Sequence, residues 1–290
     1  MPRAKIVNHP WLQSDIIVRD NWESKKPDLT SKVSSILGEP YTLEVDMNAV
    51  YAYATDGYAK DRPGDLTNAY FESFVNHIEN YVKTYGEDGK ATFNSVVPTR
   101  KITLEVDDTG KVGYCGCDIT EGRFRILSGE TYLGTNIYDS CSKIINAVQD
   151  AEAAAGGASL SVSAKANLKE AFEKERAELE KELSELLGTK ITADPNAEAI
   201  YAKMKSVSGF NDAQLGTATM AYFKGFVYCL EYLKFKGDDM MQEAFQEACS
   251  KNIVRMEVVD TLKHGSYNDA IFEDGVCKLQ VFSPLYALLT

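Results

Sequence analysis

Hydrophobic residues return at regular intervals along the chain, and their spacing predicts helices alternating with short strands. Between residues 66 and 85, apolar side chains recur every three or four positions, which is typical of one buried helical stripe. From residue 102 the period changes to two. Ile102, Leu104 and Val106 alternate with polar residues, which predicts a strand with one solvated face. Further short strands are expected at 41–46, 112–119 and 123–127.

The same pattern occurs twice. The segment Thr67–Val75 (TNAYFESFV) matches Thr219–Val227 (TMAYFKGFV) at an offset of 152 residues. Ala49-Val50-Tyr51-Ala52 matches Ala199-Ile200-Tyr201-Ala202 at an offset of 150. A nearly constant offset over so many residues indicates an internal repeat, and such periodicity takes precedence in any fold assignment.

We therefore predict an α+β fold made by internal duplication of one unit, in which several helices precede an antiparallel β-meander. Residues 108–111 (DTGK) are expected to form the first hairpin turn of that meander. The expected organisation has four parts. These are an N-terminal arm (1–30), a first repeat unit (31–128), a connecting helix with a Gly/Ala/Ser linker (129–163), and a long charged helix with the second repeat unit (164–290).

Two segments outside the repeats carry expectations of their own. Trp11 and Trp22 both lie in the arm, and two large aromatic side chains there predict that the arm packs on the body. The helix over 164–187 has one apolar stripe and charged pairs four residues apart. We interpret it as a surface helix, with a short coiled coil for homo-oligomerisation as the alternative.

Composition narrows the class of protein. The 290 residues carry a net charge of −12, which argues against a nucleic-acid partner because basic residues supply that affinity. No apolar run is long enough for a membrane span, and the N-terminus lacks the apolar core of a secretory signal. The six cysteines are then expected to be reduced thiols in a soluble cytoplasmic protein.

Familiar catalytic and metal-binding patterns do not occur in the sequence. It contains neither His-x-x-x-His nor Cys-x-x-Cys, and neither Gly-x-Ser-x-Gly nor a glycine-rich phosphate loop. The sequence therefore assigns no catalytic residue and no cofactor.

The positions at which the two copies differ are the candidate ligand-binding residues. Cys115 and Cys117 stand two apart on a predicted strand, so both thiols face the same side and are able to meet a metal or a third thiol. Their counterparts include Tyr267. His77 on the long helix and His264 in the second turn are the other candidates. The competing interpretation of each is ordinary packing or a solvated turn position.

Acidic residues near the turns are candidate metal ligands. Asp107 and Asp108 follow the strand predicted from residue 102, and Asp260 occupies the corresponding turn of the second copy. Clustered oxygens suit a hard cation such as calcium. Aspartates also cap turns by accepting hydrogen bonds from nearby backbone amides, which is the simpler interpretation.

Two functional hypotheses remain open. The first is a soluble, non-catalytic binding or scaffold protein built from two copies of one α+β unit. The second is an enzyme or small-ligand-binding protein with its site in the cleft between the units, where ligand sites often lie. In either case the partner is a protein or small molecule of unspecified identity.

Overall fold

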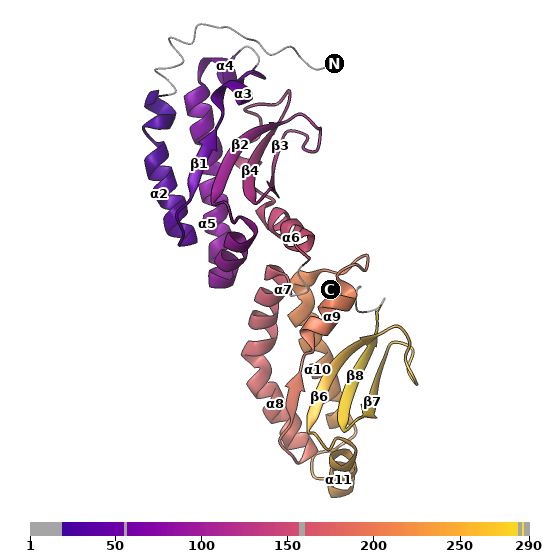
Figure 1. Cartoon of the computed structure of the whole chain (residues 1–290). Helices are drawn as coiled ribbons and strands as arrows, with labels where there is room; N and C mark the ends of the chain where they lie inside the picture. Colours follow the sequence, from indigo (N-terminus) through magenta and orange to yellow (C-terminus); the bar gives the residue numbers. More distant parts are fainter. Residues whose placement is uncertain (1–18, 55–56, 157–159, 284–285, 287–290) are drawn as a thin grey trace. The chain divides into compact units, whose positions relative to one another are not determined.

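The computed structural model describes residues 19–54, 57–156, 160–283 and 286 (Figure 1). Trp11 lies outside the described residues. The chain divides into two compact units, Met1–Gly157 and Ala158–Thr290, and each unit is described by itself. Within the described ranges, no helix is both long enough and apolar enough to cross a membrane.

The first unit begins with helices and ends with strands and a further helix. In chain order it contains η1 (Arg19–Glu23), α2 (Lys26–Leu37), β1 (Thr42–Val45), α3 (Met47–Tyr51), α4 (Tyr58–Asp61), α5 (Pro63–Val96), β2 (Lys101–Asp107), β3 (Cys115–Thr120), β4 (Arg123–Gly129), η2 (Ile137–Asp139) and α6 (Ile144–Ala154). α5 is broken at Gly86, whose φ of 60° and ψ of −145° are not helical. The predicted helix at 66–85 is therefore the first arm of one broken element.

The second unit follows a comparable order. It contains α7 (Val162–Asn167), η3 (Leu168–Glu173), α8 (Lys174–Leu187), β5 (Thr192–Asp194), α9 (Ala197–Met204), η4 (Asp212–Gln214), α10 (Leu215–Tyr232), α11 (Asp239–Ala248), β6 (Ile253–Val259), β7 (Asn268–Glu273) and β8 (Val276–Phe282). The mixed α and β content agrees with the predicted α+β class.

The predicted antiparallel meander is wrong. Each unit has a four-stranded mixed sheet, with orders β1-β2-β4-β3 and β5-β6-β8-β7. β2 pairs in parallel with both β1 and β4, and β3 pairs antiparallel with β4 at the sheet edge. Residues 108–111 consequently do not close a hairpin, because β4 lies between β2 and β3. The second sheet repeats these pairings.

Burial explains why β4 is central and β3 lies at the edge. β4 buries Phe124, Ile126 and Leu127, whereas most of β3 is only half-buried. Placing the more apolar strand between two neighbours removes more apolar surface from water. The tight hairpin is the one joining β3 to β4, where Glu121 and Gly122 both have positive φ (53° and 71°). Two such residues make the turn that fits twisted antiparallel strands.

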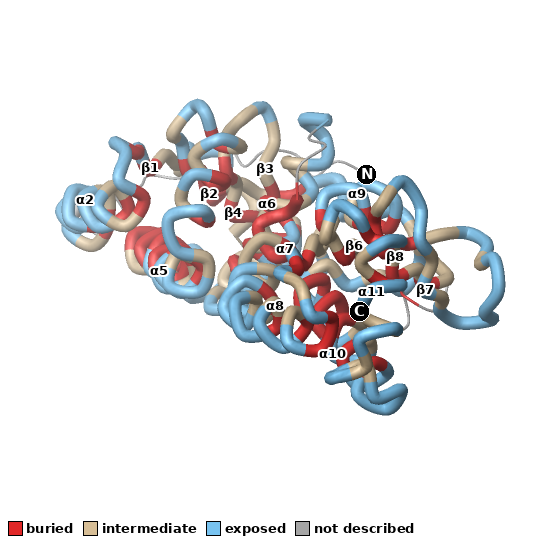
Figure 2. The backbone as a smooth tube through the Cα atoms, turned by 90° about the horizontal axis from the view of Figure 1, so that it is seen from below, coloured by how far each residue is buried: buried red, intermediate tan, exposed pale blue. Residues whose placement is uncertain are grey.

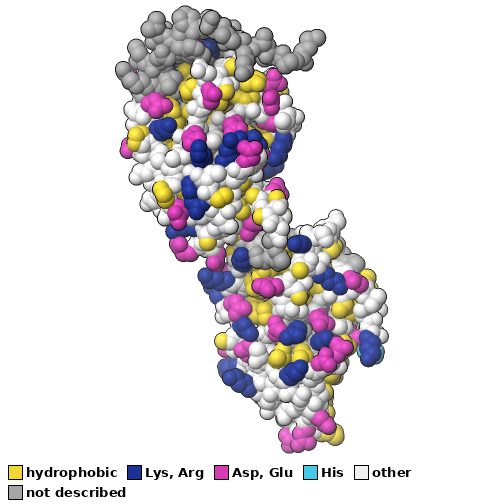
Figure 3. All heavy atoms as spheres, in the orientation of Figure 1, with side chains coloured by type: hydrophobic (Ala, Val, Ile, Leu, Met, Phe, Trp, Pro, Cys, Tyr) yellow, Lys and Arg dark blue, Asp and Glu magenta, His cyan; other side chains and the backbone are white. Residues whose placement is uncertain are grey.

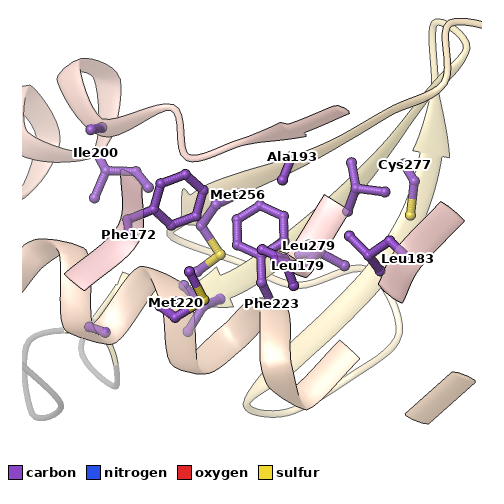
Figure 4. Close-up of a cluster of buried hydrophobic side chains, with 14 of the residues drawn as sticks. Phe172, Leu179, Leu183, Ala193, Ile200, Met220, Phe223, Met256, Cys277 and Leu279 are labelled. Atoms are coloured by element: carbon purple, nitrogen blue, oxygen red, sulfur yellow. The ribbon is translucent and has the colours of Figure 1, made fainter. Parts of the chain in front are cut away.

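Helices cover one face of each sheet. α5 contacts β2 and β4, and α10 contacts β6 and β8. Figure 2 shows the long helices buried along the side turned to their sheet and exposed along the other. In the first unit the core includes three aromatic rings in mutual contact, Phe74, Phe93 and Phe124. In the second unit helical side chains such as Phe172 and Phe223 meet Met256 and Leu279 of the sheet (Figure 4).

The two segments outside the repeats both pack. Trp22 of η1 is fully buried and stacks on Phe71 of α5, with ring centroids 4.7 Å apart. The described part of the arm therefore packs as expected. The apolar stripe of the charged helix, including Leu179 and Leu183, belongs to the core of the second unit. Only the charged face of α8 is left for self-association, which stays a prediction.

Several local contacts occur in both units at equivalent places. Gly38 and Gly188 end α2 and α8 with left-handed φ values of 74° and 68°. The Ser34 hydroxyl accepts a hydrogen bond from the Tyr41 amide, and Ser184 accepts one from Ile191. These pairs share the 150-residue offset of the sequence match.

Candidate functional site

The first unit brings three thiols together. Cys115 and Cys117 lie on β3 and are half-buried, while Cys141, between η2 and α6, is fully buried. Cys141 lies close enough to Cys117 for that neighbour to affect the pKa of its thiol. The structure thus provides the third thiol that the spacing of Cys115 and Cys117 allows for. All six cysteines of the chain are free thiols.

His77 lies on α5 next to η2, and its side chain is hydrogen-bonded to the backbone there. Its Nε2 lies 2.8 Å from the Tyr138 carbonyl oxygen, to which it donates. The Ser73 hydroxyl donates to the same oxygen at 3.3 Å, and the Gly134 amide donates to the Tyr70 hydroxyl at 2.9 Å. α5 therefore holds the segment around η2, and a further ligand-binding role for His77 stays a prediction.

Burial raises the pKa of the Cys141 thiol well above its ordinary value, and the neighbouring Cys117 adds to the effect. Burial also raises the pKa of Cys115, as does the negative charge of Asp139. Both groups are therefore protonated thiols near neutral pH, which makes them weaker metal ligands than thiolates. Among the described residues, no group of three or more His, Cys, Asp or Glu side chains has an arrangement able to hold a metal ion.

The candidate metal aspartates have separate roles. Asp107 is buried and accepts hydrogen bonds from the amides of Thr109 (3.0 Å) and Val112 (2.7 Å). Burial alone would raise the pKa of Asp107, but these bonds and that of the Thr109 hydroxyl outweigh it and lower the pKa. The contacts are those of an aspartate that closes a loop. Asp260, in the second unit, is exposed and pairs with Lys203 at 3.1 Å.

The second-unit candidates His264 and Tyr267 lie in the exposed connection between β6 and β7. The His264 amide donates to the Asp269 carboxylate at 2.9 Å, and the Tyr267 carbonyl accepts from the Phe282 amide. Their backbones thus shape the connection before β7. His264 and Tyr267 belong to the second unit, whereas Cys115 and Cys117 belong to the first.

A pocket of about 720 Å³ lies in the first unit between the end of β1, α3 and β2. Its wall has apolar patches, chiefly Val45, Val50 and Val106, and includes Tyr53. Its charged groups are four carboxylates and one guanidinium, those of Glu44, Asp46, Glu105, Asp108 and Arg123. The pocket is therefore both partly apolar and strongly acidic. Among the candidate ligand-binding and metal-ligand residues predicted from the sequence, Asp108 lines this pocket.

Two of the four pocket carboxylates are balanced by cations. Lys101 lies 3.0 Å from Glu44, and Arg123 lies 3.5 Å from Glu105. Asp46 caps α3 by accepting a hydrogen bond from the Ala49 amide at 3.0 Å. Neither Asp46 nor Asp108 forms an ion pair within the described ranges. The uncompensated charge is consequently concentrated on these two aspartates.

The second unit differs from the first in the cations that lie beside the corresponding carboxylates. Strand pairing sets Glu44 opposite Thr103 in the first sheet and Asp194 opposite Arg255 in the second. Arg255 pairs with Asp194 at 2.7 Å. Tyr53 and Asp108 correspond to Lys203 and Asp260 at the repeat offsets, and these two form the 3.1 Å pair. The second unit thus supplies its own cations where the first has Tyr53 and Thr103.

The sequence contained a partial signal for this pocket. Glu44 and Asp46 flank the end of an alternating strand, and Asp108 follows another. Their meeting depends on the parallel pairing of β1 with β2, which an antiparallel meander does not allow for. Figure 3 shows that acidic and basic side chains are interspersed over the visible surface, without a large basic patch.

The chain matches no family model, no curated protein and no solved structure among those with which it was compared. The interpretation of the site therefore depends on the geometry of this chain.

Proposed function

We propose that this chain is a non-catalytic binding protein built from two copies of one α+β unit, and that the first unit binds the ammonium group of a small organic amine. One difference between the two units carries the proposal. In the second unit Lys203 neutralises Asp260. In the first unit the corresponding residues are Tyr53 and Asp108, so a tyrosine takes the place of the lysine. An external ammonium would take the place that a lysine side chain occupies in the second unit.

Support for the duplication comes from sequence and contacts together. Both sheets have the same unusual strand order, with the third strand of each unit at the edge. The buried threonines Thr67 and Thr219 are 152 residues apart, and each meets a tyrosine hydroxyl, that of Tyr51 at 2.8 Å and that of Tyr286 at 3.1 Å. The two tyrosines do not occupy matching positions, since the counterpart of Tyr51 at the repeat offset is Tyr201, so the shared strand order is the stronger support for the proposed duplication.

The pocket suits an amine with an aliphatic body. Its volume lies in the range of small-ligand sites, which are partly apolar with a few placed polar groups. Methylene groups gain about 0.8 kcal/mol each when fully buried, so the apolar wall contributes to affinity. An ammonium ion has three donors, which suits carboxylate oxygens. A linear diamine is therefore the simplest probe.

The test is calorimetric titration of the whole protein with 1,5-diaminopentane, and with pentane-1,5-diol as the uncharged probe of similar shape. The diamine is expected to bind and the diol is not. Asp108→Asn should weaken diamine binding roughly fivefold, since a partly exposed ion pair contributes up to about 1 kcal/mol. The matched control Asp260→Asn, in the second unit, should leave it unchanged.

Two results would contradict the proposal. Equal affinity for the diamine and the diol would remove the electrostatic argument. Equal weakening by Asp108→Asn and Asp260→Asn would indicate general charge attraction rather than a site. The interaction should also weaken as salt is raised, because partly exposed charges are screened.

The alternative of an enzyme or ligand-binding protein with its site between the two units stays a prediction. The pocket and the thiol cluster both lie within the first unit. We therefore base the proposed function on the pocket of that unit.

A further inference from the structure

The thiol cluster of the first unit uses none of the pocket residues and has no part in the proposed function. We infer that Cys117 and Cys141 are a site of reversible oxidation, and that hydrogen peroxide converts this pair into a disulfide joining β3 to the start of α6.

Geometry singles out this pair among the cysteines. Cys117 lies close enough to Cys141 to contribute to the raised pKa of its thiol, although the two residues are far apart in sequence. Both η2 and α6 pack against β3, so Cys141 is held next to the strand that carries Cys117. Cys117 is half-buried, which leaves a route for a small oxidant, whereas Cys141 is enclosed.

Cys115 is a poorer partner for either thiol. Residues two apart on a strand are separated by roughly 6.7 Å between Cα atoms, near the upper limit for a disulfide. A bond between Cys115 and Cys117 would therefore strain the strand. The Cys115 thiol is also occupied, because it donates a hydrogen bond to the Asn136 carbonyl at 3.1 Å.

The bond would change how the segment from η2 to α6 is held. In the reduced protein, hydrogen bonds from Ser73 and His77 to the Tyr138 carbonyl join this segment to α5. A disulfide would add a covalent connection to β3 and close a loop of about 24 residues, which restricts the unfolded chain. Oxidation would thus make local opening of this segment rarer.

The chemistry takes two balanced steps. The Cys117 thiolate attacks one peroxide oxygen, the O–O bond breaks, and sulfenic acid and hydroxide are formed. The Cys141 sulfur then attacks the Cys117 sulfur, the S–O bond breaks, and the proton of the Cys141 thiol passes to the leaving oxygen, so that water departs. The proton released by the Cys117 thiol converts the hydroxide of the first step to water. Peroxide is reduced by two electrons and the thiol pair is oxidised by two.

The experiment is peptide mapping by mass spectrometry of the whole protein, after treatment with hydrogen peroxide and blocking of the remaining thiols. The expected product is a cross-linked peptide pair containing Cys117 and Cys141, about 2 Da lighter than the reduced peptides. Dithiothreitol should reverse it. Cys249 and Cys277 of the second unit are both buried and near one another, and serve as the internal control. They should stay reduced under the same treatment.

Matched variants keep the test decisive. Cys117→Ser should abolish the cross-link, and Cys115→Ser should preserve it. If Cys117→Ser does not fold, the map of the unmodified chain still identifies the bonded pair. The inference is overturned if Cys115 is the bonded residue, or if Cys117 and Cys141 stay reduced while other thiols are oxidised. A second readout is hydrogen exchange, which should slow by at least threefold in residues 136–148 after oxidation.

Discussion

At the residue scale, the aspartates show how one residue type takes on different roles. Asp107 and Asp108 are neighbours in sequence and carry the same carboxylate group. Asp107 is buried and closes a loop, whereas Asp108 is exposed and lines the pocket. The sequence predicted an acidic turn here and left open whether it served a cation or the backbone. The difference between the two residues depends on the direction of each side chain relative to the sheet, which sequence does not specify.

Asp107 offers a test of this assignment through stability. We expect Asp107→Ala to lower the free energy of unfolding at pH 7 by about 1–3 kcal/mol, because two partly buried hydrogen bonds to backbone amides lose their acceptor. Asp108→Ala is the matched control and should change it by less than about 0.5 kcal/mol. Urea unfolding followed by circular dichroism measures both.

The stability difference between the native chain and Asp107→Ala should also depend on pH. The folded pKa of Asp107 is lowered, so its ionisation stabilises the fold above the unfolded value of about 3.9. That contribution is lost as pH falls through the folded pKa. The difference between the native chain and Asp107→Ala should therefore shrink as pH falls below the unfolded pKa of about 3.9. A difference that is the same at pH 7 and pH 2.5 would contradict the role of the carboxylate.

At the scale of elements, the helices could be predicted more fully than the sheet. The stripe around Tyr70 and Phe74 and the terminal glycines Gly38 and Gly188 locate helices through local periodicity and local φ preference. Strand order depends on which strand buries most area, a comparison across the whole unit. The pair Glu121-Gly122 carried a hairpin signal, but the Asp-Thr-Gly-Lys stretch at 108–111 was the more familiar turn pattern.

Gly122 tests the hairpin. Its φ is 71°, and a Cβ added there would meet the Pro98 ring at 3.0 Å. We expect Gly122→Ala to lower the free energy of unfolding by about 1–2 kcal/mol, through positive φ and this close approach. Gly113 is the control, because a Cβ there meets nothing within 4 Å and its φ is not positive. A larger cost for Gly113→Ala than for Gly122→Ala would contradict the assignment of the turn.

At the scale of the whole molecule, the proposed internal repeat is what makes the pocket interpretable. Comparing Tyr53 with Lys203 shows where the first unit lacks a cation that the second supplies. The sequence matches at offsets of 150 and 152 residues, on which the proposed repeat is based, were visible from the sequence. The pocket was not, because Asp46 and Asp108 meet only through a parallel strand pair that the predicted meander did not contain.

The measurement that tests the central claim most directly is titration of 1,5-diaminopentane into variants in which Tyr53 and Lys203 are exchanged. Tyr53→Lys should weaken binding of 1,5-diaminopentane at least as much as Asp108→Asn does, because the new side chain would neutralise Asp108 from within. Adding Lys203→Tyr to that variant should restore one binding event, now weakened by Asp260→Asn instead of Asp108→Asn. If Tyr53→Lys binds the diamine as tightly as the native chain, the first unit does not hold the amine site proposed here.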